Sequence, residues 1–321
     1  MIITKSPFRI SFFGGSSDYR NFYEKHGSLL IGTTINKHVY ASLRFKQKIF
    51  TDKSIINYSK REEVENVNQI DHPLIRELLK LYNINFSFDL TTFSDIPQRT
   101  GLGGSSSFAV AILLAIHKKL KIPFDQKKLA LDAIKVEREI LNEPGGIQDQ
   151  IWASYGGFNS IEIKTDGDFT IRPLPISKNF IEEFEKSLVL IYTNQQRNSN
   201  KIAKEHEKYD KSKILDIAKE GYKSFCNENI EEIGNLLKQS WIEKQKISND
   251  ISTDNINSIT KTLDSIDGVY GFKLLGSGNG GFIVVLCNEY GKEKLNSIFK
   301  NQILPIKLTN NGVECILEEE E

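Results

Sequence analysis

The stretch Pro97-Gln-Arg-Thr-Gly-Leu-Gly-Gly-Ser-Ser-Ser-Phe108 decides the fold that the sequence predicts. Ahead of it, Phe86, Phe88 and Leu90 alternate with polar residues, which is the pattern of a half-buried strand. Behind it, the run AVAILLAIHKKL has apolar residues at helical spacing. The sequence therefore predicts a strand, a glycine loop and a helix, in that order.

This order predicts an anion site at the start of the helix. Glycines let the backbone approach a ligand, and the first amides of a helix point at it with the positive end of the helix dipole. Ser105, Ser106 and Ser107 add hydroxyls that can reach phosphate oxygens or a magnesium ion. A glycine turn with serine caps would look similar, but a cap needs only one serine. Phosphate is the anion that we expect.

Other phosphate-binding families do not fit the sequence context. A Walker loop needs Gly-Lys-Ser or Gly-Lys-Thr, and neither occurs in the chain. The dinucleotide fingerprint appears at Gly276-Ser-Gly-Asn-Gly-Gly281, but the strand-like run FIVVLC follows it where a helix is required. The HRD and DFG sequences of protein kinases are also missing.

The composition limits the partners and the compartment. The 321 residues suffice for two domains, and 42 basic residues balance 42 acidic ones. No global field attracts nucleic acid or an acidic membrane, so we expect neither as a partner. Cys226, Cys287 and Cys315 are widely spaced, which suits a reducing compartment. No signal peptide or membrane span is visible, and we expect a cytoplasmic protein.

The first residues predict a sugar contact and a buried arginine. Strands are expected at residues 2–4 and 9–13, after which Gly14-Gly15 turns the chain. Asp18 follows this turn, and a carboxylate can accept two hydrogen bonds from a vicinal diol, although an Asp that closes a loop would look the same. Arg9 lies within an apolar strand and therefore needs a carboxylate partner.

Residues 126–142 predict a helix with an inward carboxylate. At 100° per residue Glu137 falls within the apolar stripe, while Arg138 points away. The stripe consists of Leu129, Ala133, Ile140 and Leu141. A buried carboxylate must meet an arginine or a metal ion, and a structural ion pair is the alternative to a functional site.

Asp149 follows on a segment that we expect to be a loop. Pro144-Gly145-Gly146 ends the helix, and the glycines can hold the acid rigidly within reach of a substrate, as a general base requires. An ordinary loop acid is the alternative. The composition changes near Gly167, and we expect two domains, at residues 1–168 and 169–321.

The other segments predict strands and helices that form the framework of the fold. Residues 28–50 suggest two or three strands. In the second half we expect helices at about 211–226, 229–247 and 255–266. Residues 271–300 then predict a strand, a glycine loop, a strand and a helix, typical of an antiparallel α+β sandwich.

Three segments, in this order and spacing, resemble the motifs of the GHMP kinases. They are SPFRISFFGGSSDY from Ser6, PQRTGLGGSSSFAVAIL from Pro97 and FKLLGSGNGGFIVVL from Phe272. Within this family the chain is most similar to the D-glycero-D-manno-heptose 7-phosphate kinases, and then to the fucokinases, through GGIQDQIWASYGG at 145–157 and WIEKQKISNDIS at 241–252.

The resemblance implies the α+β, two-domain GHMP kinase fold, with a ribosomal-protein-like N-terminal domain and a ferredoxin-like C-terminal domain. It implies ATP and Mg²⁺ between them, with Asp149 activating the sugar hydroxyl beside Arg9, and with Ser105 and Glu137 on the metal. The residues implied to bind ATP are Pro97, Gly101, Leu102, Gly103, Gly104, Ser105, Ser106 and Ser107. The residues implied to bind the substrate are Ser17, Asp18, Tyr19, Arg197, Gly278 and Gly280.

The implied reaction transfers the γ-phosphate of ATP to the anomeric hydroxyl of D-glycero-D-manno-heptose 7-phosphate. The 1,7-bisphosphate would serve nucleotide-activated heptose and surface glycan synthesis, in lipopolysaccharide or capsule. The substrate phosphate needs a second basic site, for which Arg197 with Lys201 or Arg20 is expected. A fucokinase or another free-sugar 1-kinase is the alternative, and a non-catalytic sugar sensor comes third. A homodimer is compatible with the resemblance.

The chain departs from the family pattern at Gly104 and Gly15, and at Ser277 and Asn279, which replace the Ala and Gly of the commoner GAGGGG motif. Gly104 stands where many relatives have the first serine of the loop, so that Ser106 or Ser107 could bind the metal in place of Ser105. Gly15 replaces a glutamate of the galactokinase motif, which argues against a true galactokinase.

Overall fold

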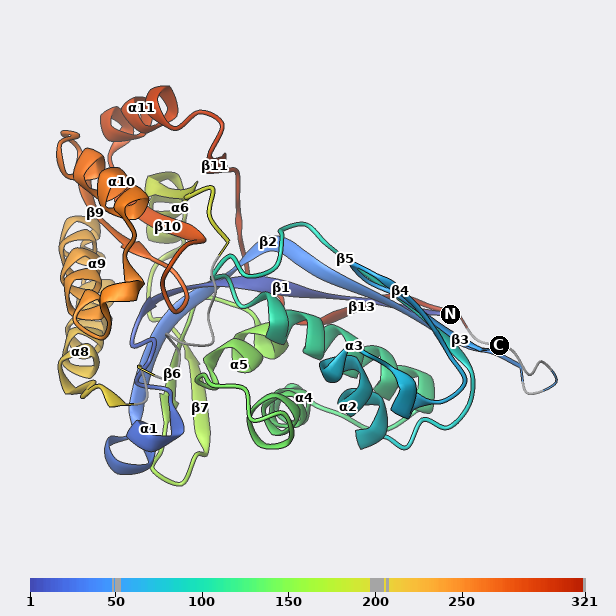
Figure 1. The fold of residues 1–321 in the computed structure, drawn as a ribbon. Helices are drawn as coiled ribbons and strands as arrows, with labels where there is room; N and C mark the ends of the chain where they lie inside the picture. The colour runs from blue at the N-terminus through green and yellow to red at the C-terminus, as the bar shows by residue number, and fades with distance from the viewer. Residues whose placement is uncertain (48, 50–52, 197–204, 206–207, 320–321) are drawn as a thin grey trace.

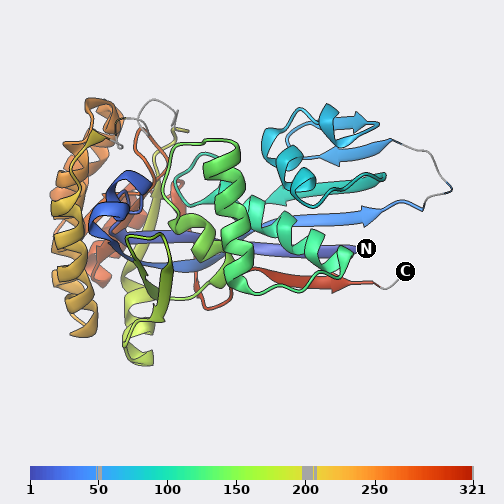
Figure 2. The ribbon, with the colours of Figure 1, turned by 90° about the horizontal axis from the view of Figure 1, so that it is seen from below.

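The protein folds into two sheets with helices packed against them (Figures 1 and 2). The computed structural model describes residues 1–47, 49, 53–196, 205 and 208–319. The two ends of the sequence lie side by side, because Ile2 of the first strand pairs with Glu318 of the last. Among the described residues, no helix is both long and apolar enough to span a bilayer.

The larger sheet has nine strands in the order β13-β1-β2-β5-β3-β4, and β6, β7 and β12 join it through β2. All pairs are antiparallel except β3 with β5. The first half of β2 pairs with β6, while its second half pairs with β5. The strands are β1 (Ile2–Phe13), β2 (Ser28–Phe45), β3 (Ser54–Asn57), β4 (Arg61–Val64), β5 (Phe88–Ser94), β6 (Asn159–Ile163), β7 (Phe169–Pro173), β12 (Leu308–Thr309) and β13 (Glu314–Glu318).

The first two strands are longer than the sequence predicts. β1 runs without a break through Pro7, and the register shifts between Pro7 and Phe8, where β2 carries extra residues. Proline has no N–H for the ladder, and a bulge in the partner strand absorbs the missing bond. The prediction of separate strands at 2–4 and 9–13 is therefore wrong, as is that of two or three strands in 28–50, which form one strand up to Phe45.

Helices α2 to α5 cover one face of this sheet (Figure 1). Helix α3 is buried from Ser106 to His117, because it lies between the sheet and its neighbouring helices. Its first turn is therefore fixed relative to β1, to which it packs. The helices and 3₁₀ turns of this half are α1 (Arg20–His26), Val67–Gln69, α2 (Pro73–Leu81), α3 (Gly104–Leu120), α4 (Gln126–Ile134) and α5 (Gln148–Tyr155).

Helix α4 does not continue as one α-helix to residue 142. It passes into a π-helical turn, Lys135–Ile140, in which each turn contains more residues. Glu137 is fully buried, as predicted, but Ile140 of the expected apolar stripe is 41% exposed. The wider turn rotates the residues that follow Glu137 relative to the α-helical register.

The smaller sheet has the order β11-β8-β10-β9, and α9 packs against β9. Helix α8 contacts both α9 and the long strands β1 and β2, as Figure 2 shows on the side away from the termini. The expected strand, glycine loop, strand and helix are confirmed. The elements are α6 (Lys178–Ser187), β8 (Leu188–Tyr192), α8 (Ser212–Cys226), α9 (Ile230–Gln245), Asn249–Ile251 (3₁₀), α10 (Asp254–Asp264), β9 (Val269–Leu274), β10 (Phe282–Cys287), α11 (Glu289–Ile298) and β11 (Ile303–Leu304).

Both halves of the chain contribute to one core. Phe12 of β1 packs against Phe184 of α6 and Phe225 of α8, with ring centroids 5.3 and 5.8 Å away. Strands β7 and β13 belong to the larger sheet although they follow residue 168. The division into domains at residue 168 stays a prediction.

Candidate active site

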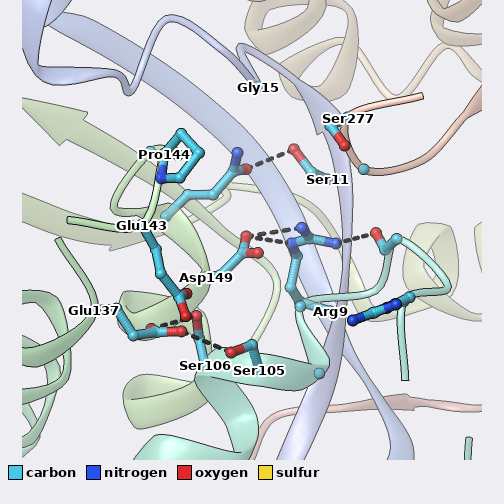
Figure 3. A pocket seen from close by; sticks show the side chains of 18 of the residues that line it. Arg9, Ser11, Gly15, Ser105, Ser106, Glu137, Glu143, Pro144, Asp149 and Ser277 are labelled. Carbon is cyan, nitrogen blue, oxygen red and sulfur yellow. Dashed lines mark hydrogen bonds and ion pairs between the residues drawn. The ribbon is translucent and has the colours of Figure 1, made fainter. Parts of the chain in front are cut away.

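A cavity of about 630 Å³ opens where β1, the loop before α3, the segment from Glu137 to Asp149 and the β9–β10 loop meet (Figure 3). These segments lie far apart in the sequence. The cavity brings together most of the residues that the sequence singled out: Arg9, Asp18, Tyr19, Gly101, Gly103, Gly104, Ser105, Ser106, Glu137 and Asp149.

The glycine loop forms one wall of the cavity. Gly101 and Gly103 have φ values of 87° and 79°, in the left-handed region that favours glycine. A Cβ at Gly103 would lie 3.2 Å from Arg9 and 3.5 Å from the carboxylate of Asp149. The Ser107 amide makes the first bond of α3, to the carbonyl of Gly103 at 3.0 Å. The amides ahead of it are therefore left for an anion at the helix start.

Three of the residues expected around ATP do not line the cavity. The Ser107 hydroxyl is buried and donates to the carbonyls of Pro7, at 2.7 Å, and Gly103, at 3.1 Å. Leu102 is in the core, and its carbonyl accepts from the Arg9 amide. Pro97 lies at the surface, before the residues that form the wall.

Arg9 and Asp149 form the ion pair that the sequence required. Nε of Arg9 donates to Oδ1 of Asp149 at 2.8 Å, and Nη2 lies 2.7 Å from the same oxygen (Figure 3). The third nitrogen, Nη1, donates to the carbonyl of Gly101 at 2.7 Å. The guanidinium thus connects the acid to the glycine loop, while the Asp149 side chain remains 22% exposed to the cavity.

Asp149 does not lie on a loop, as the sequence predicts, but in the first turn of α5. The two glycines before it, Gly145 and Gly146, lie just ahead of α5, so they mark where this helix begins. The positive end of a helix dipole favours a carboxylate at this position.

Glu137 is held by neutral donors. Its Oε1 accepts from the Ser105 hydroxyl at 2.9 Å, and its Oε2 accepts from the Ser106 hydroxyl at 2.8 Å (Figure 3). Oε2 also accepts from Nε2 of Gln150 at 2.5 Å. Within the described ranges no lysine or arginine forms an ion pair with it. The buried charge therefore has no cation from the described protein.

The oxygen atoms around Glu137 suit a hard cation. Mg²⁺ prefers oxygen ligands and is usually held by one or two carboxylates together with substrate phosphates and water. In the part of the chain that the structure describes, no cluster of three or more His, Cys, Asp and Glu residues could hold a metal ion. An ion beside Glu137, Ser105 and Ser106 would need ligands from a bound phosphate.

Arg138 lines the cavity, although the sequence predicts that it points away. Nε donates to the carbonyl of Gly146 at 2.9 Å, and Nη1 donates to that of Glu143 at 3.1 Å. The side chain thereby holds the loop between the π-helical turn and α5. Burial, followed by the nearby Glu137 carboxylate, raises the pKa of Glu143, a cavity residue that sequence reasoning missed.

Asp18 is fully buried beside the start of α5. Its Oδ1 accepts from the Ser16 amide at 3.0 Å, and its Oδ2 accepts from the Gln148 amide at 3.1 Å. Burial is the largest cause that raises the pKa of Asp18, to about 6. Gln148 also accepts from the Ser11 hydroxyl at 2.7 Å, so this missed residue links β1 to the Asp18 turn.

The neighbours of Asp18 differ in their placement. Tyr19 lines the cavity, and its ring lies 5.5 Å from the ammonium of Lys211. The Ser17 hydroxyl is buried instead, where it donates to the carbonyl of Gly14 at 2.7 Å and lies 2.6 Å from the hydroxyl of Ser28. Ser17 therefore supports the turn and does not face the cavity.

The β9–β10 loop contributes other residues than expected. Gly276 and Ser277 line the cavity. Gly278 instead faces Ile251, and Gly280 faces the carbonyl of Gln195. The loop turns away from the site after Ser277.

The residues expected at a second phosphate are not brought together. Arg197 and Lys201 lie outside the described residues. Arg20 is exposed, and its Nε donates to Glu24 at 2.7 Å, away from the cavity.

Two buried lysines of the cavity were missed. Lys244 donates to the carbonyls of Leu274 and Gly276, and Lys273 donates to the carbonyl of Phe12 at 2.8 Å. Burial, and then the Arg9 guanidinium, lower the pKa of Lys273 to about 7. Lys273 could have been found by the argument used for Arg9, because it is also a basic residue within an apolar strand.

Comparisons with known proteins place the chain in a family. Residues 69–157 match the GHMP kinases N terminal domain, and residues 222–301 match the GHMP kinases C terminal domain, together more than half of the chain. The D-glycero-alpha-D-manno-heptose 7-phosphate kinase of Campylobacter jejuni is 29% identical over 98% of both chains. A bifunctional fucokinase/GDP-fucose pyrophosphorylase of Arabidopsis thaliana is 25% identical over 64% of this chain and 20% of its own length.

Solved structures agree with this fold. A D-glycero-D-manno-heptose 1-phosphate kinase from Bacteroides thetaiotaomicron has a TM-score of 0.80 at 22% identity and full coverage of both chains. The galactokinase of Lactococcus lactis, solved with galactose, has a TM-score of 0.74 at 16% identity, over 98% of this chain and 94% of its own. With both domains matched and the full length covered, the chain belongs to the GHMP kinases.

Proposed function

We propose that the protein is an ATP-dependent sugar kinase that phosphorylates the anomeric hydroxyl of D-glycero-D-manno-heptose 7-phosphate, giving the 1,7-bisphosphate. The observation that carries the proposal is the Asp149 carboxylate, which faces the cavity beside the glycine loop and is held there by Arg9. The full-length similarity to a heptose 7-phosphate kinase supports this substrate.

ATP would bind with its phosphates on the loop from Gly101 to Ser106. The left-handed glycines and the first amides of α3 suit a phosphate group at this position. We therefore keep Gly101, Gly103, Gly104, Ser105 and Ser106 as the ATP-binding residues.

Magnesium would lie beside Glu137, with Ser105 and Ser106. A magnesium ion in this position supplies charge neutralisation on the phosphates during transfer. The protein contributes the carboxylate orientation, since Gln150 and the two hydroxyls fix both oxygens of Glu137.

Asp149 would take the proton of the sugar hydroxyl as that hydroxyl attacks the γ-phosphorus, and the bond from the γ-phosphorus to the β-phosphate oxygen would break to release ADP. Arg9 holds the carboxylate in one orientation by two contacts to the same oxygen. Asp18, which accepts from the amide of Gln148 next to Asp149, would accept hydrogen bonds from sugar hydroxyls. Catalysis would consist mainly of positioning and charge stabilisation, as is usual for phosphoryl transfer.

The test is ADP formation with ATP and magnesium across five acceptors: D-glycero-D-manno-heptose 7-phosphate, the unphosphorylated heptose, L-fucose, D-galactose and D-mannose. We expect turnover with the 7-phosphate. Turnover only with a free sugar would instead favour the fucokinase-like alternative, which the Arabidopsis relative supports. A cytoplasmic role in nucleotide-activated heptose and surface glycan synthesis would follow from a positive result.

A further inference from the structure

Lys273 is a buried cation in the cavity that the reaction described above does not use. It lies on β9, its side chain is among those that line the cavity, and the residue is only 5% exposed. A lysine is almost never buried to this degree unless it is paired.

The ammonium of Lys273 has spare hydrogen-bonding capacity. It has three N–H donors, and its one hydrogen bond within the described ranges goes to the carbonyl of Phe12 at 2.8 Å. No described carboxylate forms an ion pair with it. A buried ammonium with unused donors at a cavity wall is suited to an anionic ligand.

The position of Lys273 favours the acceptor over the nucleotide. Arg9 contacts the glycine loop, whereas Lys273 contacts the carbonyl of Phe12, three residues after Arg9 on β1. Ser11 and Gly15, on either side of Phe12, line the cavity on the way to Asp18. The ammonium therefore lies toward the end where we place the sugar.

The other basic side chains that line the cavity already have partners or are exposed. Arg9 pairs with Asp149, Arg138 donates to two loop carbonyls, and Lys244 donates to two carbonyls of the β9–β10 loop. Arg99 is exposed and precedes the glycine loop. Among the described residues, Lys273 is the buried cation that an acceptor phosphate could engage.

We propose that Lys273 binds the phosphate group of a phosphorylated sugar acceptor and so selects it over the free sugar. The inference rests on the proposed function, and names the residue that would recognise the second phosphate. Burial and the Arg9 guanidinium lower the pKa of Lys273 in the protein alone, and a phosphate dianion next to the amine would raise it again by favouring the charged form.

The test compares Lys273→Met with the wild type on D-glycero-D-manno-heptose 7-phosphate and on the unphosphorylated heptose, at saturating ATP and magnesium. Methionine keeps the apolar stem and removes the ammonium. We expect kcat/KM for the 7-phosphate to fall roughly 10- to 100-fold, mainly through KM, and that for the free heptose to change less than about threefold. Equal losses on both acceptors would overturn the inference.

Two controls keep the result interpretable. Lys238→Met removes a lysine that pairs with Asp264 outside the cavity, and it should leave kcat/KM unchanged for both acceptors. Should Lys273→Met unfold, wild-type affinities decide the matter. With a non-hydrolysable ATP analogue, the 7-phosphate should bind at least about tenfold more tightly than free heptose, and equal affinities would overturn the inference.

Failure of the proposed function would look different. It would appear in the wild type alone, as the absence of ADP formation with the 7-phosphate, and would remove the inference with it. Failure of the inference alone would leave the wild type active on the 7-phosphate and Lys273→Met without selectivity between the acceptors.

Discussion

Two walls of the cavity hold their carboxylates in opposite ways: the start of α5 carries Asp149, and the π-helical turn carries Glu137. Asp149 is paired with Arg9, so its charge is compensated within the protein. Glu137 is fully buried and accepts only from hydroxyl and amide donors. Neutral donors orient a carboxylate but leave its charge for an incoming cation. On our proposal, Asp149 would act in the orientation that the protein already gives it, whereas Glu137 would need a metal ion and a bound phosphate to complete its site.

The largest effect should come from Asp149→Asn, which keeps the shape and removes the base. We expect kcat to fall roughly 100- to 10,000-fold, while the dissociation constant of ATP changes less than about threefold. Steady-state ADP release and calorimetric ATP titration would measure the two quantities.

The matched control for this change is Asp216→Asn on an exposed turn of α8, where the acid pairs with Lys219 at 3.5 Å. It should leave kcat unchanged. If Asp149→Asn kept nearly normal turnover, the proton would have to go elsewhere and the comparison with Glu137 would lose its basis.

Glu137→Gln should have the next largest effect, through magnesium. Removing the uncompensated charge should lower kcat/KM for ATP roughly 100- to 1,000-fold and raise the magnesium concentration needed for half-maximal activity. A magnesium titration of activity at fixed ATP measures both effects.

Glu139→Gln is the control, because Glu139 lies on the same π-helical turn but is exposed. An unchanged magnesium requirement in Glu137→Gln would mean that the three neutral donors are a structural network, and that the metal ligand lies elsewhere.

The part of the cavity where we place the nucleotide, from the glycine loop to Glu137, could be predicted from the sequence because its signals are local. A strand, a glycine loop and a helix follow one another within a short stretch, and the 3.6-residue period places Glu137 inside. The π-helical turn could not be predicted, because a single wider turn does not change the apolar pattern of the sequence visibly. Ile140 and Arg138 were therefore assigned to the wrong sides of the helix.

The acceptor end, by which we mean the part of the cavity around Asp18, Asp149 and Lys273, could be predicted only in part. Segments that are distant in the sequence assemble it. The sequence shows that Arg9 needs a carboxylate, but its partner lies 140 residues away and only the fold brings the two together. The same holds for Lys273, whose ammonium meets a carbonyl 261 residues away. Which loop residues face the cavity depends on backbone geometry, so Ser277 was missed and Gly278 was included.

Gly146→Ala would test how tightly the acceptor end is packed. A Cβ at Gly146 would lie 1.8 Å from Oδ2 of Asp18, which is buried and hydrogen-bonded. Because this carboxylate cannot move without losing its bonds, we expect a loss of about 3 kcal/mol or more in the free energy of unfolding. Denaturant titration measures it.

Gly15→Ala is the control for this substitution. A Cβ at Gly15 would lie 3.3 Å from the Ser11 hydroxyl, a distance at which a side chain can adjust. Its cost should be smaller. If the two variants were equally stable, the segment before α5 would be more yielding than its contacts with Asp18 indicate.

The smallest effect is the pH dependence that distinguishes Asp18 from Asp149. The pKa of Asp18 rises from 3.8 to about 6 on folding, because burial penalises its charged form. The stabilising contribution of the protonated acid is therefore fully present below about pH 4 and is lost as the pH rises through 6. The side chain at position 18 cannot titrate in the Asp18→Asn variant. The difference in the free energy of unfolding, wild type minus variant, should therefore fall between pH 4 and 7, by at most about 3 kcal/mol.

Denaturant titrations of both proteins at several pH values would measure this difference, in which the titrations of all other groups cancel. A difference that does not change with pH would show that Asp18 stays ionised in the folded protein throughout. The amides of Ser16 and Gln148 would then stabilise its charge as fully as Arg9 compensates Asp149. A fall through pH 6 would instead mean that Asp18 is charged in the folded protein at neutral pH at a cost in stability. On our proposal, a bound sugar would relieve part of this cost by donating hydrogen bonds to the carboxylate.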